Sequence, residues 1–594
     1  MGEYQFGIVD VPGHERFIRQ MLAGATGMDL VMLVIAADDS IKQQTREHLD
    51  ILRLLNVPTG IIVLTKVDLV EPDWCDLVEQ EIGELVADTF LANAPIIRCS
   101  SKTGQGIEEL KQQLQHSASM VVKTRSNDLE HEPFRMAIDR TFSIEGFGTV
   151  VTGSVSSGKI HVGDIVELQP SGIEARIRGL QNHDTTTDVV ERGQRAAINL
   201  SGIHHDQIHR GDELAQAGHL KPARQIGVEL LALNPERQVV KDRMRVRFHV
   251  GTTEVAGNLR LPPESRELAV GQRAVAILYL QEPVVAVWGQ PYVIRLESPV
   301  LTLGGGRVLF ANPLQTARPT QRDWIFLSEL GDSDEEKRIA AAIFLLGFTD
   351  WKLLDLARLA GVASAETTVE KLLASGELKR LVITKDRHYI VHRERIHEVS
   401  DLIVRHLERM HAEHPLRLGH PVLELQNYFH YLPTPELFRS ALKSLSDEKK
   451  LVVSGTAVAL EGHGPQLSKG ERLLFDEILQ SVKRGGIAPE SPEQIRGRVP
   501  KNRESVQQLF ELAASSGELI KLAEDWYVHR ETWGQMSEQL ASAFASKPEL
   551  TVSEIKAIFD VSRKLAVPLC EFLDRNGYTR RNGDVRVWVG KSDA

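Results

Sequence analysis

Strand-like and helix-like segments alternate over the first part of the chain. The run 29–36 is nearly continuous in apolar side chains, and shorter strand-like runs cover residues 4–9 and 60–64. A continuous apolar run is typical of a strand buried on both faces of a parallel sheet. Leucines at helical spacing in residues 45–55 predict an amphipathic helix between two of these strands. The alternation predicts a doubly wound α/β domain over residues 1–116, with ligands at the carboxyl ends of its strands.

A different pattern follows this first domain. Short runs of β-branched residues separated by glycines, such as 148–153 and 162–167, replace the long apolar runs. Such spacing predicts small antiparallel β-barrels rather than a parallel sheet. We expect one barrel over residues 132–217 and a second over residues 222–313.

The rest of the chain is helical in pattern and repeats itself. Ser-Gly-Glu-Leu occurs at 375–378 and at 516–519, and each copy leads to strand-like residues that end in His-Arg-Glu. With weaker copies included, the repeating unit is roughly 60–70 residues long. Helices followed by two short strands are the order of a winged helix, which often binds nucleic acid, although a packed spacer is the alternative for most copies. The four predicted modules cover residues 322–395, 398–463, 466–532 and 535–594.

Composition narrows the class of protein. The chain has 594 residues, of which 42% are hydrophobic and 25% charged, as in multidomain globular proteins. It contains no run of 18 apolar residues, so we expect no membrane partner. Three distant cysteines without metal spacing fit a reducing, cytoplasmic compartment. A net charge of −11 argues against a chain that coats nucleic acid along its whole length, but it permits a local basic surface.

Two short motifs suggest nucleotide chemistry. Asp-Val-Pro-Gly-His at 10–14 follows the first strand-like run, and Thr-Lys-Val-Asp at 65–68 follows the run 60–64. In the first motif an aspartate, Asp10, can approach Mg²⁺, and only a glycine, here Gly13, lets the backbone amide meet a γ-phosphate. In the second, the carboxylate of Asp68 can accept hydrogen bonds from the N1 and N2 donors of guanine, which adenine lacks. The pair of motifs predicts a guanine nucleotide site.

A third strand-like segment and one missing element complete this prediction. Ser100 and Ser101 follow the segment 95–99 and could offer backbone amides to the oxygen of the base. No Gly-x₄-Gly-Lys-Ser/Thr loop precedes the two motifs, and the nearest match, 153–160, ends in an isoleucine that has no hydroxyl for Mg²⁺. We therefore expect a truncated GTPase domain of the phosphate-loop type, without its phosphate loop and first switch, and weak nucleotide binding by the chain as given.

The last module is locally basic. Its positive residues gather at a predicted helix start and at a predicted strand-turn-strand wing around Asn582 and Gly583. A helix start beside a basic wing can hold an RNA hairpin, mainly through phosphates and shape, although a solvated charged face is the alternative. The candidate RNA-binding residues are Arg563, Lys564, Arg580, Arg581 and Arg586.

Taken together, these motifs resemble a known family. Asp-Val-Pro-Gly-His-Glu at 10–15, Gln-Thr-Arg-Glu-His-Leu at 44–49 and Thr-Lys-Val-Asp look like a translational GTPase of the elongation factor Tu class. Gly-Phe-Gly-Thr-Val-Val-Thr-Gly at 146–153 looks like the second domain of that class. With its tail of winged helices and basic last module, essentially the whole chain is similar to the selenocysteine-specific translation elongation factors of bacteria.

The resemblance implies roles for the nucleotide motifs. His14 would position the attacking water, Asp10 would contact Mg²⁺ through bound water, and Lys66 would lie along the guanine ring. GTP, GDP and Mg²⁺ are then the expected cofactors. Thr65 stands where the guanine motif more often has asparagine, so Asp68 is the firmer prediction of the two.

The resemblance also implies a substrate and partners. Asp139, Arg140 and Arg195 would recognise selenocysteine, whose selenol is largely anionic near neutral pH and so suits two arginines. A buried Asp–Arg pair that braces the barrel is the alternative. The implied function is GTP-dependent delivery of selenocysteinyl-tRNA to the ribosome at recoded UGA codons by a monomer tethered to an mRNA hairpin.

Two other functions remain open from the sequence. The chain could be a non-hydrolytic, RNA-binding remnant of such a factor, because the phosphate loop is expected to be missing. A general elongation factor is the third candidate, but ordinary delivery of tRNA needs no tail that holds mRNA.

Overall fold

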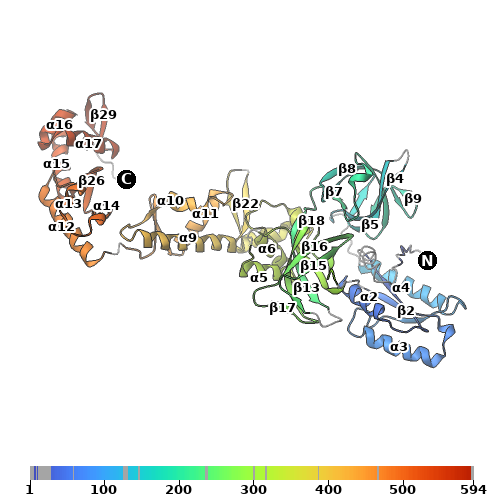
Figure 1. Cartoon of the computed structure of the whole chain (residues 1–594). Coiled ribbons are helices and arrows are strands. Elements are labelled where there is room, and N and C mark those ends of the chain that lie inside the picture. The colour runs from blue at the N-terminus through green and yellow to red at the C-terminus, as the bar shows by residue number, and fades with distance from the viewer. Residues whose placement is uncertain are drawn as a thin grey trace. The chain divides into compact units, whose positions relative to one another are not determined.

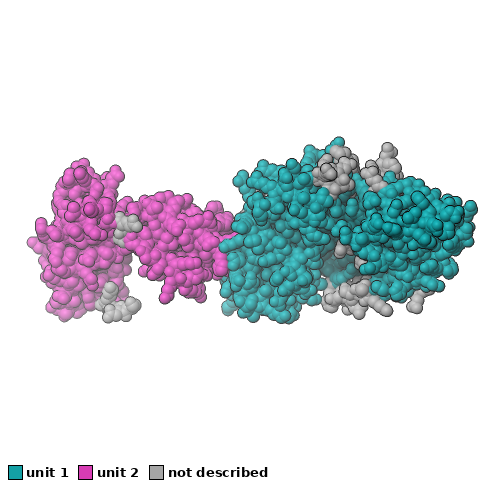
Figure 2. Space-filling view, turned by 90° about the horizontal axis from the view of Figure 1, so that it is seen from below, with its two compact units in different colours: residues 1–395 teal, residues 396–594 magenta. Residues whose placement is uncertain are grey.

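The computed structural model describes most of the chain as two compact units, residues 1–395 and 396–594 (Figure 2). All three cysteines are free and buried. Among the described residues no helix is both long and apolar enough to span a membrane. The described residues are 4, 6–8, 10, 28–55, 57, 59–124, 132–144, 148–233, 239–298, 301–314, 318–385, 387–464 and 467–589.

The first part of the first unit is a parallel sheet covered by helices on both faces (Figure 1). Ile62 and Leu64 point toward α2 and α3, whereas Ile61 and Val63 point toward α4. This explains why the predicted strand 60–64 is continuously apolar, since side chains alternate between two buried faces. The strands, in the order β1-β2-β3, are Val31–Ala36, Gly60–Thr65 and Ile96–Arg98; the helices are α2 (Gln43–Leu54), η2 (Val67–Leu69), α3 (Pro72–Val86) and α4 (Ile107–Thr124).

One expectation for this sheet was wrong. Met32 and Val34 on β1 are 45% and 52% exposed, so the described residues bury this strand on one face only. Both side chains share a face with Ile61 and Val63, but they lie outside the cluster that α4 forms with Ile61, Val63 and Ile97. An apolar run therefore predicted the strand correctly and the number of its buried faces incorrectly.

The next part is an antiparallel barrel. β11 pairs with β5 on one side and with β8 on the other, which closes the ring β11-β5-β4-β12-β7-β8 around a core that includes Met136, Ile138 and Val151. Its elements are β4 (Arg135–Ile144), β5 (Gly148–Ser157), β6 (Lys159–His161), β7 (Ile165–Gln169), β8 (Ile173–Asn182), β9 (Thr185–Thr187), β10 (Val189–Glu191), β11 (Arg195–Ser201), η3 (His205–Gln207) and β12 (Glu213–Gln216).

A second, six-stranded closed barrel follows, in the order β13-β18-β16-β15-β19-β20. Helix α2 packs on this barrel: Ile51 and Leu54 contact Leu231 and Val293, so the α/β domain and the second barrel share a core. The strands are β13 (Ala223–Ala232), β14 (Val240–Lys241), β15 (Arg245–Val250), β16 (Thr253–Arg260), β17 (Glu267–Leu268), β18 (Arg273–Val284), β19 (Pro291–Arg295) and β20 (Thr302–Ala311).

The first helical module packs against the second barrel. The amide of Trp288 donates to the carbonyl of Arg358 at 2.7 Å, and its indole donates to Leu330 O at 2.8 Å. A Cβ added to Gly361 would lie 2.1 Å from the Trp288 ring, so a glycine is required there. This module therefore packs directly on the second barrel. It contains α5 (Gln321–Glu329), α6 (Glu335–Leu346), α7 (Leu353–Ala360), α8 (Glu366–Ser375), β21 (Leu378–Val382) and β22 (His388–His392).

The second unit repeats the order of helices followed by a hairpin. Its first module has α9 (Arg393–Glu413), β23 (His420–Pro421), α10 (Val422–Gln426), η4 (Asn427–Phe429), α11 (Pro435–Asp447), β24 (Leu451–Ser454) and β25 (Ala457–Leu460). The next has α12 (Lys469–Gly485), α13 (Pro492–Arg498), η5 (Arg503–Ser505), α14 (Val506–Ser515), β26 (Leu519–Ala523) and β27 (Trp526–His529). The last has α15 (Arg530–Ser546), β28 (Glu549–Thr551), α16 (Val552–Phe559), α17 (Arg563–Arg575), β29 (Thr579–Asn582) and β30 (Val585–Trp588).

A group of packed histidines lies in the first module of the second unit. The ring of His411 stacks on that of His463 with centroids 3.5 Å apart, and its centroid is 4.9 Å from that of His420. His411 and His420 are both buried, and Nε2 of His411 accepts a hydrogen bond from the amide of Leu460. Burial, followed by the neighbouring histidines, lowers the pKa of His411 to about 4.

We predict that acid destabilises this module. The pKa of His411 is lower in the folded chain than in the unfolded one, so its contribution is intact above about pH 6.5 and is lost as the pH falls toward 4. The protection factors of the amides in residues 404–460, which correct for the intrinsic pH dependence of hydrogen exchange, should therefore fall across this window. His411→Gln, which keeps an acceptor but does not titrate, should flatten the dependence, and His430→Gln on the surface should not. An unchanged profile in His411→Gln would contradict the assignment.

Candidate functional site

The predicted guanine motif lies at the carboxyl end of β2. Thr65 is the last residue of the strand, and its hydroxyl donates to Ile35 O on β1 at 3.3 Å. Lys66 follows with φ 57°, in the left-handed region, and Asp68 lies in the short helix η2 with an exposed side chain. The turn thus leaves the carboxylate of Asp68 at the surface, where it can meet a ligand.

The backbone joins this motif to the predicted serine loop. The amide of Cys99 donates to Leu64 O at 2.7 Å, and the amide of Val67 donates to Cys99 O at 3.4 Å. Ser100 is fully buried, and its hydroxyl accepts from the amide of Thr103 at 3.1 Å, whereas Ser101 is exposed. Ser100 therefore shapes the loop, and Ser101 is the residue of the pair that faces solvent.

Lys66 has a partner that the sequence did not point out. Its Nζ lies 3.0 and 2.9 Å from the two carboxylate oxygens of Asp38, in the turn after β1. The hydrogen bond to Asp38 raises the pKa of Lys66, so the ammonium stays charged. The signal was present, because Asp38 and Asp39 come shortly after the strand-like run 29–36, at the same edge of the sheet as Lys66.

The phosphate side of the predicted site is described only at Asp10, which is exposed. Gly13 and His14 lie outside the described residues. In the described part of the chain, no three histidine, cysteine, aspartate or glutamate side chains are grouped so as to hold a metal ion. At the other end of the site, the exposed carboxylate of Asp68 and the loop at Ser101 offer the acceptor and the donor that a guanine base requires. The roles of Asp10, Gly13 and His14 stay predictions.

The predicted aminoacyl residues lie on two strands of the first barrel that flank a third. Asp139 and Arg140 lie on β4, and Arg195 lies on β11, with β5 between them. Nη2 of Arg195 is 2.6 Å from Oδ2 of Asp139, and the hydroxyl of Thr152 on β5 donates to Oδ1 at 2.8 Å. Arg195 is 43% exposed and Asp139 25%, so this ion pair is not the buried brace that was the alternative.

The basic residues of the last module fall into two groups. Arg563 and Lys564 are exposed at the start of α17, and Arg580 and Arg581 are exposed on β29. Arg586 on β30 is only 5% exposed, and its Nε donates to Asp574 of α17 at 2.9 Å. Arg586 faces the helix and not solvent, so we remove it from the RNA-binding candidates.

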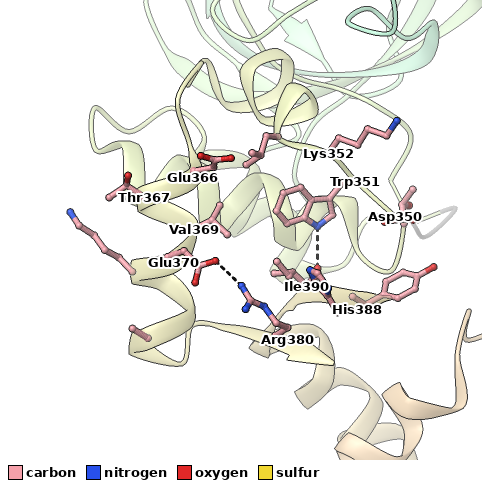
Figure 3. A pocket seen from close by; sticks show the side chains of 15 residues that line it. Asp350, Trp351, Lys352, Glu366, Thr367, Val369, Glu370, Arg380, His388 and Ile390 are labelled. Atoms are coloured by element: carbon pink, nitrogen blue, oxygen red, sulfur yellow. Dashed lines mark hydrogen bonds and ion pairs between the residues drawn. The ribbon is translucent and has the colours of Figure 1, made fainter. Parts of the chain in front are cut away.

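An open hollow in the first helical module contains none of the predicted site residues. Its volume is about 970 Å³, and it lies between α8, the hairpin β21–β22 and the segment before α7 (Figure 3). The indole of Trp351 donates to Ile390 O at 3.0 Å, and Arg380 pairs with Glu370 at 2.6 Å (Figure 3). Both contacts hold the module together.

Comparison with known proteins decides the family. Family models match at four places: "Elongation factor Tu GTP binding domain" at residues 1–120, "Elongation factor Tu domain 2" at 148–215, and "Elongation factor SelB, winged helix" at 404–460 and at 542–588. The chain is 32% identical to the selenocysteine-specific elongation factor of Desulfomicrobium baculatum, over 98% of this chain and 91% of that protein. The chain belongs to the selenocysteine-specific elongation factors.

Further comparisons agree with membership among the selenocysteine-specific elongation factors. The factors of Haemophilus influenzae and Escherichia coli are each 27% identical, over 99% and 97% of this chain and over 91% and 89% of those proteins. A crystal structure of a bacterial selenocysteine-specific elongation factor matches the fold with a TM-score of 0.55 and 23% identity, over 97% of this chain and 89% of that chain. The predicted multidomain fold of a GTPase domain, β-barrels and winged helices is confirmed, and the RNA-binding remnant is not favoured.

Proposed function

We propose that this selenocysteine-specific elongation factor binds selenocysteinyl-tRNA in its GTP form and delivers it to the ribosome in the cytoplasm, as a monomer tethered to an mRNA hairpin. The observation that carries the proposal is the cationic patch of Asp139, Arg140 and Arg195 on the first barrel. Two arginines beside one carboxylate leave a net positive charge, which suits an anionic selenolate and not a neutral serine hydroxyl.

The guanine nucleotide would be held mainly by the carboxyl ends of β2 and β3. Asp68 would accept hydrogen bonds from the base, Lys66 would lie along its ring, and Ser101 would offer its amide to the base oxygen. Mg²⁺, when bound, would neutralise charge on the phosphates, and Asp10 would contact it through water. His14 would position the attacking water once the ribosome orients it.

The test compares two aminoacylated forms of one tRNA. The full chain with GTP is mixed with the selenocysteine tRNA carrying either selenocysteine or serine, and both affinities are measured. A clear preference for the selenocysteinyl form is expected. Equal affinities would overturn the proposal, because the tRNA body is identical in the two forms.

The last module would hold the mRNA hairpin through Arg563, Lys564, Arg580 and Arg581. We predict that Arg580→Ala and Arg581→Ala each weaken binding of the selenoprotein mRNA hairpin by about fivefold to tenfold and lower the slope of log affinity against log salt by about 1, since each removes one phosphate contact. Arg575→Ala, at the other end of α17, serves as the control and should change neither quantity. Salt slopes unchanged in both wing variants would show that the wing does not bind phosphates.

A further inference from the structure

β4 contains a β-bulge at the predicted aminoacyl site. Ile138 pairs with Gly153 on β5 and Arg140 pairs with Thr152, so Asp139 is the extra residue between them. A bulge turns a side chain to a new direction and is held in place by its surroundings. Here the amide of Ile138 donates to Asp212 O at 2.9 Å, and its carbonyl accepts from Thr252 of the second barrel at 3.1 Å. The bulge is therefore fixed from both barrels.

Each carboxylate oxygen of Asp139 has its own partner. Oδ1 accepts from the hydroxyl of Thr152 at 2.8 Å, and Oδ2 lies 2.6 Å from Nη2 of Arg195. The two partners stand on β5 and β11, so the carboxylate is held by neighbouring strands at both oxygens. Without the hydroxyl, rotation about the Cβ–Cγ bond of Asp139 would be limited by the arginine alone.

The remaining charge in the patch is positive. Asp139 offsets Arg195, and among the described residues no ion pair of Arg140 is present. A carboxylate that is paired with a guanidinium and fixed in orientation repels an incoming anion less than one that can turn an oxygen toward that anion. The orientation of Asp139 therefore affects how well an anion is received.

We propose that Thr152 is a positioning residue for selenocysteine recognition. Its hydroxyl orients the carboxylate of Asp139, and this carboxylate holds the guanidinium of Arg195 where it meets the selenolate. The inference rests on the proposed function and adds to it a residue that acts through Asp139 and does not itself contact the amino acid.

The experiment measures discrimination in the full chain with GTP. The readout is the ratio of affinities for the selenocysteine tRNA carrying selenocysteine and the same tRNA carrying serine. Thr152→Val keeps the shape and β propensity but removes the hydroxyl, and it should lower this ratio by about tenfold, as expected for one hydrogen bond to a charged group. Thr152→Ser should keep the ratio. The matched control is Thr149→Val on the same strand, whose buried hydroxyl donates to Ile203 O at 2.9 Å. It should leave the ratio unchanged.

A double-mutant cycle separates positioning from a general structural effect. If Thr152 acts through Asp139, Thr152→Val should have no further effect on the ratio in an Asp139→Ala background. Additive effects of the two substitutions on the ratio would overturn this inference but not the proposed function. The same holds if the wild type discriminates between the two tRNA forms and Thr152→Val leaves the ratio unchanged. A wild type that does not discriminate would overturn the proposed function and this inference with it.

Discussion

Arg195→Ala is expected to lower the affinity for selenocysteinyl-tRNA by about 100-fold, through the loss of a charged hydrogen bond and the exposure of an unpaired carboxylate to the selenolate. Arg195 faces Asp139 at 2.6 Å, so its removal leaves the patch with one arginine and one carboxylate. The affinity for the seryl form of the same tRNA should change much less, because a hydroxyl gains little from the guanidinium. Competition binding with the GTP-loaded full chain measures both values.

The first barrel offers a closely matched control. Arg192 pairs with Glu132 at 3.1 Å, with side chains 41% and 22% exposed, against 43% and 25% for Arg195 and Asp139. Arg192→Ala therefore removes a similar ion pair from the same barrel and should leave discrimination intact. An equal loss in the two variants would show that the barrel, and not the patch, had been disturbed.

The strongest sequence signals were those in which local pattern and burial agree. The run 60–64 became β2, and the motif after it lies at the carboxyl end of the sheet beside the serine loop. Asn582 and Gly583 lie at the turn of the predicted hairpin, where Gly583 has φ +62°. In both places one short segment contains all the information that the local structure needs.

The sequence did not fix properties that depend on distant segments. The alternation of side chains along β30 defines two faces of the strand, but it does not tell which face is buried. Because Val585 and Val587 are apolar, their face looked like the buried one, yet Arg586 on the other face is the buried residue. Arg586 is the buried residue because Asp574 lies under it on α17. Similarly, Met32 and Val34 look like core residues in the sequence, but they are exposed and lie outside the cluster that α4 covers.

The candidate site shows the same division. Sequence and resemblance named Asp139, Arg140 and Arg195, which the structure brings together, but not Thr152 or Asp38. Thr152 contacts Asp139 across two paired strands, and Asp38 contacts Lys66 between the turns that follow β1 and β2, so both hydrogen bonds join residues that are distant in sequence. Such contacts follow from register, and register depends on the bulge at Asp139 and on the parallel pairing of β1 with β2.

Arg358→Ala is expected to lower the local free energy of opening of α7 by about 3–5 kcal/mol, the usual cost of removing one partner from a buried ion pair. Arg358 is fully buried, its Nη2 lies 3.0 Å from Oδ1 of Asp355, and its Nη1 donates to Ala311 O of the barrel at 2.7 Å. Asp355 would keep Lys221, but that lysine is half exposed. The variant would also leave the carbonyl of Ala311 without its buried donor.

Hydrogen exchange of residues 353–360 measures this opening, and the first helical module contains its own control. Arg380 and Glu370 pair at 2.6 Å on the surface, with side chains 44% and 65% exposed, so Arg380→Ala should cost no more than about 1 kcal/mol. A loss in Arg358→Ala no larger than in Arg380→Ala would mean that the buried pair does not hold the module to the barrel. The expected large difference would show that the buried pair of Arg358 and Asp355 holds the first helical module to the second barrel.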